Sequence, residues 1–199
     1  MRRATTLLGI LTIAACGPPD GHRSETGAAS SAATDTAVTA DTAAAKPKLT
    51  DPNIVALLDE ANKADSTAGA LAATKATNPA VKDFAKMMMS EHHALRQAGQ
   101  QLAKQLKVTP EPPAENPLTP LVESETTALK STPKGAEFDK VYIEQEITAH
   151  KAVLDLAGEA YDQAQNEQLK ALIEKAKPVI QKHLDQAEKI QGELAKPTA

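Results

Sequence analysis

The sequence predicts an all-α protein: an antiparallel four-helix bundle with an extra short helix between the second and third long helices. From residue 50 onward, apolar residues recur at alternating steps of three and four, the spacing of a helix face packed in a bundle. No stretch alternates apolar and polar residues with the period of a β-strand. Four long amphipathic segments joined by short links then favour an antiparallel bundle.

Start and stop signals give the helix bounds. Asp51-Pro52 and Asn78-Pro79 each offer a capping acceptor followed by proline at the first helical position, and Asn166 offers a third cap. Proline-rich or glycine-containing loops separate the remaining segments. The predicted helices cover about residues 52–77, 79–107, 117–130, 136–164 and 167–196.

The first 15 residues are typical of a bacterial lipoprotein signal peptide. Two arginines precede an apolar run over residues 7–15 that is too short to span a bilayer. The run ends in Ile13-Ala14-Ala15-Cys16, which resembles the lipobox, and Cys16 is the only cysteine in the chain. We therefore expect residues 1–15 to be removed and lipid on Cys16 to anchor the protein to a membrane. The alternative is an ordinary signal peptide with a chance cysteine.

The residue after the cysteine predicts the membrane to which the protein is sorted, and the composition of residues 16–49 predicts whether this segment folds. The residue after Cys16 is Gly17, and not the aspartate that retains lipoproteins at the inner membrane, so we expect the periplasmic face of the outer membrane. Residues 16–49 are rich in Ala, Thr, Ser and Gly and hold too little apolar surface to fold. We expect a lipidated, disordered stalk over 16–49 and a folded domain over 50–196.

Composition excludes several classes of function. A net charge of −4 and an aromatic content of 2% argue against a nucleic-acid partner. One cysteine excludes an intramolecular disulfide framework and a multi-cysteine metal site. No glycine-rich nucleotide fingerprint occurs, and no pairing of a nucleophile with a base stands out, so we predict no catalytic residues.

One polar residue interrupts the apolar face of each long helix. These residues are Asp65, His92, His150 and His183, and each falls near the middle of its predicted helix. Midpoints pack against midpoints in an up-down bundle, so the four side chains are predicted to share one central layer. Glu146 precedes His150 by one helical turn and can reach the same layer.

Two interpretations of this layer compete. Three imidazoles with Asp65 or Glu146 suit a single divalent transition metal ion. Alternatively, the layer is a hydrogen-bonded polar network that fixes the register of the helices. A histidine on a helix face more often has the second role, which favours a lipid-anchored envelope protein whose bundle serves in binding or support. The alternative function is a metal-binding or metal-dependent redox protein.

Several segments resemble domain-of-unknown-function family 4142, which comprises bacterial envelope proteins with a ferritin-like helical bundle. The segments are Leu71-Ala72, Lys75-Ala76, Asn78 to Ala85, Met88, Glu91-His92, Phe138 to Ile143, His150, and His183-Leu184 with Ala187. The resemblance covers about residues 51–195 and implies the fold, but no activity. A ferritin-like di-iron centre needs Glu-x-x-His on two helices. Ile180 occupies the glutamate position before His183, so we do not expect that centre.

Overall fold

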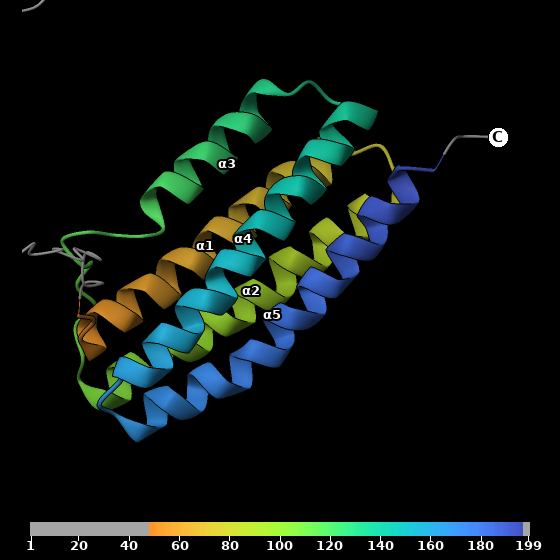
Figure 1. The fold of residues 1–199 in the computed structure, drawn as a ribbon. Coiled ribbons are helices and arrows are strands. Elements are labelled where there is room, and N and C mark those ends of the chain that lie inside the picture. The colour runs from red at the N-terminus through yellow and green to blue at the C-terminus, as the bar shows by residue number, and fades with distance from the viewer. Residues whose placement is uncertain (1–47, 197–199) are drawn as a thin grey trace, which may run out of the picture. The chain divides into compact units, whose positions relative to one another are not determined.

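A computed structural model describes residues 48–196 and confirms the predicted fold class. The predicted signal peptide, Cys16 and nearly all of the predicted stalk lie outside these residues. The helices are α1 (Asp51–Lys75), α2 (Pro79–Leu106), α3 (Thr119–Ser131), α4 (Ala136–Gln163) and α5 (Glu167–Leu194) (Figure 1). No helix in the described range is long and apolar enough to cross a membrane.

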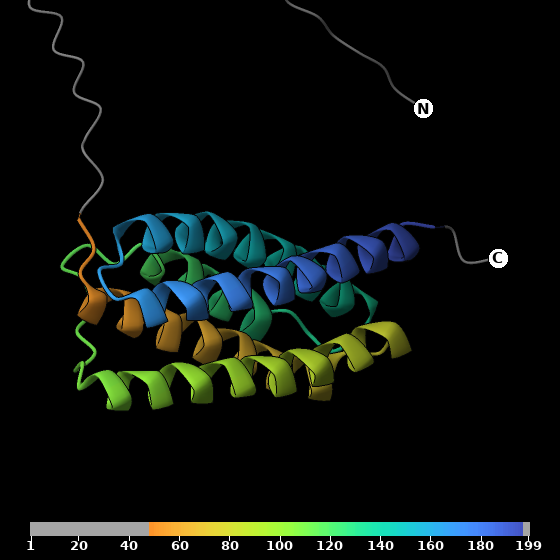
Figure 2. The same ribbon diagram turned by 90° about the horizontal axis from the view of Figure 1, so that it is seen from below.

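The four long helices alternate in direction around the core. Helices α1 and α2 form one tightly packed pair and α4 and α5 form the other, with α2 against α5 and α1 against α4. The starts of α1 and α5 and the ends of α2 and α4 lie at the same end of the bundle (Figure 2). The short α3 lies outside this bundle and packs on α1 and α4 (Figure 1).

Capping side chains explain where α1, α2 and α5 begin. The predicted caps Asn78 and Asn166 are confirmed, because each side chain accepts hydrogen bonds from backbone N–H groups of the first turn. The prediction for α1 was wrong by one residue. Its cap is Thr50, which forms a reciprocal capping box with Asn53, and Asp51 instead accepts a hydrogen bond from the backbone N–H of Gln165.

Two polar or small residues fix the approach of α1 to its neighbours. The carboxylate of Asp139 on α4 accepts hydrogen bonds from the backbone N–H groups of Thr77 and Asn78 and from the Thr77 hydroxyl. Gly69 allows α1 to approach α2 closely, because a Cβ at this position would lie 2.8 Å from the carbonyl oxygen of Ala85. The Asp139 contacts therefore tie the α1–α2 loop to α4, and Gly69 lets α1 and α2 pack closely on each other.

A polar layer divides the apolar core into two clusters. One cluster surrounds Phe84, Phe138 and Tyr142, and the other surrounds Ile54, Leu169 and Ile173. Along each long helix the change from one cluster to the other falls at the predicted polar position, which is Asp65, His92, His150 or His183. The layer therefore lies in the interior of the bundle, with apolar packing on both sides.

Candidate metal centre

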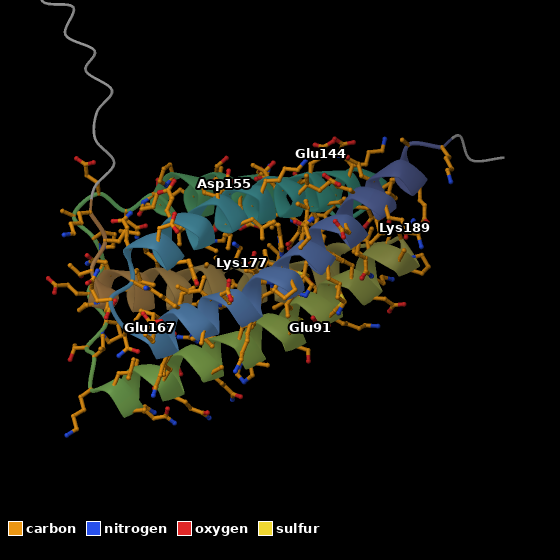
Figure 3. The ribbon with its side chains drawn as sticks, turned by 60° about the horizontal axis from the view of Figure 1, so that its bottom comes forward. Glu91, Glu144, Asp155, Glu167, Lys177 and Lys189 are labelled. Carbon is orange, nitrogen blue, oxygen red and sulfur yellow. The ribbon has the colours of Figure 1, made fainter. Side chains whose placement is uncertain are left out.

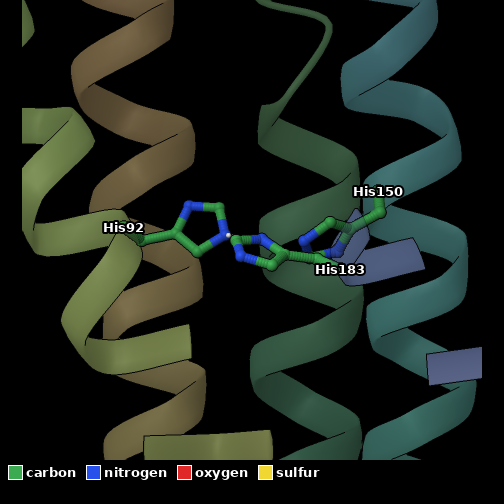
Figure 4. Close-up of side chains that lie close together, drawn as sticks. All are labelled: His92, His150 and His183. Atoms are coloured by element: carbon green, nitrogen blue, oxygen red, sulfur yellow. Dashed lines mark hydrogen bonds between the residues drawn. The ribbon is translucent and has the colours of Figure 1, made fainter. Parts of the chain in front are cut away.

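Three imidazole rings meet in the middle of the bundle, as the sequence predicts. His92, His150 and His183 come from α2, α4 and α5, and their side chains are buried (Figure 4). Their ring centroids are 5.0–5.5 Å apart. One ring nitrogen from each lies within 4.8 Å of the others. The three rings are therefore close enough to share one ion.

His92 is oriented by acceptors on α1. Its Nδ1 lies 3.0 Å from Oδ1 of Asn62 and 3.3 Å from Oδ2 of Asp65. The amide of Asn62 donates to the backbone carbonyl of Leu58, which turns its oxygen toward His92. Because Nδ1 faces acceptors, it carries the ring proton, and Nε2 keeps its lone pair.

His183 is oriented by a carboxylate that reaches the surface. Its Nε2 lies 2.8 Å from Oε2 of Glu91, whose other oxygen accepts from Lys182. The hydrogen bond from Lys182, with a further contribution from that of His183, lowers the pKa of Glu91, although its partial burial opposes them. Glu91 therefore accepts the Nε2–H of His183, which leaves the lone pair on Nδ1. Figure 3 shows Glu91 on α2, on the side that faces α5.

His150 is held by its own helix. Its Nδ1 donates to the backbone carbonyl of Glu146 at 2.8 Å, an acceptor that the i, i+4 spacing brings within reach. Its Nε2 is buried and has no hydrogen-bond partner in the described structure. Nε2 is thus the nitrogen of His150 that remains for a further ligand.

Burial keeps two of these imidazoles neutral. Desolvation, with a further contribution from His183, lowers the pKa of His92 to about 3. Desolvation lowers the pKa of His150 to about 4, although the charge of Asp65 opposes it. Neutral imidazole is the form that ligates metal ions.

The three lone pairs converge because the three N–H groups point outward. Nε2 of His92 and Nδ1 of His183 are 3.2 Å apart (Figure 4). With both ring protons committed elsewhere, this contact brings two acceptors together, which a shared cation would relieve. Two nitrogens bound to one ion at about 2.0–2.1 Å lie about 3.3–3.6 Å apart in tetrahedral or trigonal geometry. The 3.2 Å spacing of this pair lies just below that range.

Oxygen ligands occupy the other side of His150. Ligand atoms of Asp65, Glu146 and His150 lie within 4.8 Å of one another, and all three side chains are buried. Burial raises the pKa of Asp65. It also raises the pKa of Glu146 well above its usual range, and the nearby charges of Asp65 and Glu125 raise the Glu146 pKa further. Burial, reinforced by Asp65, raises the pKa of Glu125 to about 8.

All five predicted site residues therefore lie together, with Asp65 next to His92 and Glu146 next to His150. Their roles as ligands remain predictions. Sequence reasoning missed Asn62 and Glu125 and did not pair Glu91 with His183. His93 is exposed, as its position one residue off the apolar face predicts.

Comparisons with known proteins agree with this fold. A search of curated protein sequences finds no match. The structure is similar to that of CopM in the Cu(II)-bound form, with a TM-score of 0.61 and 15% sequence identity, over 74% of this chain and 99% of that chain. At this identity the likeness concerns the fold. The model of the domain of unknown function DUF4142 matches residues 36–190, and the chain therefore belongs to the DUF4142 family.

Proposed function

We propose that this protein binds one copper ion through His92, His150 and His183. The observation that carries the proposal is the direction of the three ring protons: each N–H faces an outer acceptor, so the remaining lone pairs converge in the buried core. Histidines that ligate a metal ion usually donate their other N–H to such an acceptor, which fixes the tautomer of the ring. In a purely structural layer the acceptor nitrogens would also be paired with donors, whereas here Nε2 of His150 has no partner and Nε2 of His92 faces Nδ1 of His183. The proposal thus departs from the interpretation that sequence alone favoured.

The donor set supports copper among the metals. Imidazole ligands suit copper, zinc, nickel and iron, and Cu(II) binds nitrogen ligands most tightly of the divalent first-row ions. The copper-bound form of CopM, a protein of the same fold, adds independent support. The ion would sit between α2, α4 and α5, away from bulk water, where it would link three helices.

A titration of metal-free, untagged protein with Cu(II) tests the proposal. We expect one tightly bound equivalent, measured by calorimetry and by metal analysis after gel filtration. Removing an outer acceptor of a ligand costs about 10–100-fold in affinity, so His183→Ala, which removes a ligand, is expected to cost about a hundredfold or more.

The matched control is His93→Ala, because His93 neighbours His92 on the same helix but is exposed. It is expected to bind copper like the wild type. Equal losses in the His93 and His183 variants, or no tight binding by the wild type, would overturn the proposal.

We propose further that lipid on Cys16 holds the bundle at the periplasmic face of the outer membrane. The lipobox resemblance supports the anchor, and Gly17 after the cysteine supports the outer membrane. Cys16→Ala is expected to move the protein from the membrane pellet to the soluble fraction of lysed cells. An unchanged distribution between the two fractions would contradict the anchor.

A further inference from the structure

The carboxyl side of the polar layer contains buried carboxyl groups with few partners. Glu146 is 0% exposed, and its nearest polar neighbours are Nδ1 of His150, 3.4 Å from its Oε2, and the Tyr142 hydroxyl. Oε1 of Glu125 is buried without a hydrogen-bond partner. A buried carboxyl group is normally hydrogen-bonded, ion-paired or bound to a metal ion.

These carboxyl groups converge from three helices. Asp65 on α1 and Glu146 on α4 offer oxygens within 4.8 Å of a nitrogen of His150 and of each other. Glu125 on α3 faces both carboxyl groups closely enough to interact with them electrostatically. In the described part of the chain, no lysine or arginine forms an ion pair with any of the three. A divalent cation that displaces the protons of these buried carboxyl groups would ligate their oxygens.

We propose that Asp65, Glu146 and His150, with Glu125 beside them, form a second cation position that takes an oxygen-preferring divalent ion of the Mn²⁺ class. Three carboxyl groups provide up to six oxygens, which suits an ion that favours oxygen ligands in octahedral geometry. The copper position, in contrast, is built from nitrogen alone. This proposal goes beyond copper at the three histidines and does not rest on it.

His150 belongs to both positions. Its Nδ1 lies 3.4 Å from Oε2 of Glu146 and donates to the Glu146 carbonyl, whereas its Nε2 is the nitrogen left for copper. A neutral imidazole has one lone pair, so an ion at the carboxyl position would take that lone pair on Nδ1, with the ring proton moved to Nε2. His150 then ligates one of the two ions at a time, and their binding is mutually exclusive. The layer becomes a two-position site in which the class of metal selects between nitrogen and oxygen ligands.

The two positions also differ in access. A groove of about 420 Å³ between α1 and α3 is lined by Glu125 and runs past Glu60, Lys63 and Lys130. Of the carboxyl groups in the layer, Glu125 is the one that lines this groove. The imidazole side reaches the surface elsewhere, through Glu91, whose side chain is 33% exposed.

Electron paramagnetic resonance of Mn²⁺ tests the second position, because the six-line signal of the aqueous ion falls when the ion binds protein. Added to the metal-free full chain, Mn²⁺ is expected to bind at one equivalent, and Cu(II) at one equivalent is expected to release it. No loss of signal with the wild type, or both ions bound together, would overturn the proposal without requiring any variant.

Variants then separate the two positions. Glu146→Gln is expected to weaken Mn²⁺ binding at least tenfold, while Glu144→Gln, an exposed control on the same helix, is expected to leave it unchanged (Figure 3). His183→Ala is expected to lose copper and keep Mn²⁺. Equal Mn²⁺ binding in the Glu146 and Glu144 variants overturns the second position, provided that circular dichroism shows both folded. If the wild type binds Mn²⁺ but not copper, only the proposed function is overturned.

Discussion

Glu125 offers a quantitative test of the buried polar layer. Its side chain is 4% exposed on α3, and burial next to Asp65 raises its pKa from 4.5 to about 8. Between these two pH values the folded protein keeps the proton, while the unfolded chain releases it. The folded state then binds more protons, so the stabilisation is complete below pH 4.5 and is lost as the pH rises toward 8.

The magnitude follows from the pKa difference. Each pH unit between the two values changes the free energy of unfolding by about 1.4 kcal/mol, so the full penalty above pH 8 is about 4–5 kcal/mol. Glu125→Gln removes the ionisable group and keeps its shape. The variant is therefore expected to match the wild type near pH 4.5, and to become more stable than it by about 1.4 kcal/mol per pH unit up to pH 8.

Urea denaturation of metal-free protein at pH 4.5, 6.0, 7.0 and 8.0 measures this difference. Glu123→Gln is the control, because Glu123 is exposed on the same helix two residues away. It is expected to differ from the wild type by less than about 0.5 kcal/mol at every pH. A stability difference for Glu125→Gln that does not change with pH would refute the claim that burial keeps this group protonated.

Three further predictions concern the layer and the helix contacts. In the fold His150 stays neutral down to its pKa of about 4, whereas in the unfolded chain it gains a proton below pH 6.5, so the protein loses stability as the pH falls between these values. His150→Gln removes this titration, and its stability deficit relative to the wild type should therefore shrink by about 1.4 kcal/mol per pH unit from pH 6.5 to 4. A deficit in urea denaturation that stays constant with pH would contradict this. Asp139→Ala leaves two backbone N–H groups of the α1–α2 loop and the Thr77 hydroxyl without their acceptor. The free energy of unfolding, measured by heat or urea, should fall by about 2–4 kcal/mol. A fall of less than about 0.5 kcal/mol would contradict this role of Asp139. Gly69→Ala forces a methyl group against a backbone carbonyl of α2 and should lower the free energy of unfolding by about 1–3 kcal/mol. Gly158→Ala places its methyl group in open space on α4 and should raise the free energy of unfolding by about 0.5–1 kcal/mol. Stability changes of the same sign in the two variants would contradict the close packing of α1 on α2.

The sequence predicts the helices and the polar layer because both depend on local periodicity. The spacing of apolar residues identifies the buried face of each helix. A polar residue at the centre of that face lies in the middle layer of the bundle, whatever the arrangement of the neighbouring helices. Periodicity alone therefore identifies Asp65, His92, His150 and His183. The metal interpretation depends on the directions of the ring N–H groups and the distances between the rings, which periodicity does not give.

Contacts that depend on another helix are the part that the sequence leaves out. Glu91 points about 100° away from its neighbour His92 on α2, which excludes it from that residue's side of the layer. The same rotation brings it to His183 on α5. Glu125 was missed because it lies on the short α3, outside the four-helix bundle, although α3 packs on α1 and α4 and brings a third carboxyl group to the layer.

Anomalous diffraction at the copper edge tests the central claim most directly. Crystals of the full chain grown with one equivalent of Cu(II) are predicted to show one strong peak inside the bundle, about 2.0–2.1 Å from Nε2 of His92, Nδ1 of His183 and Nε2 of His150. A peak only at the surface, for instance at the exposed His93, or no peak between the three rings, would contradict the account.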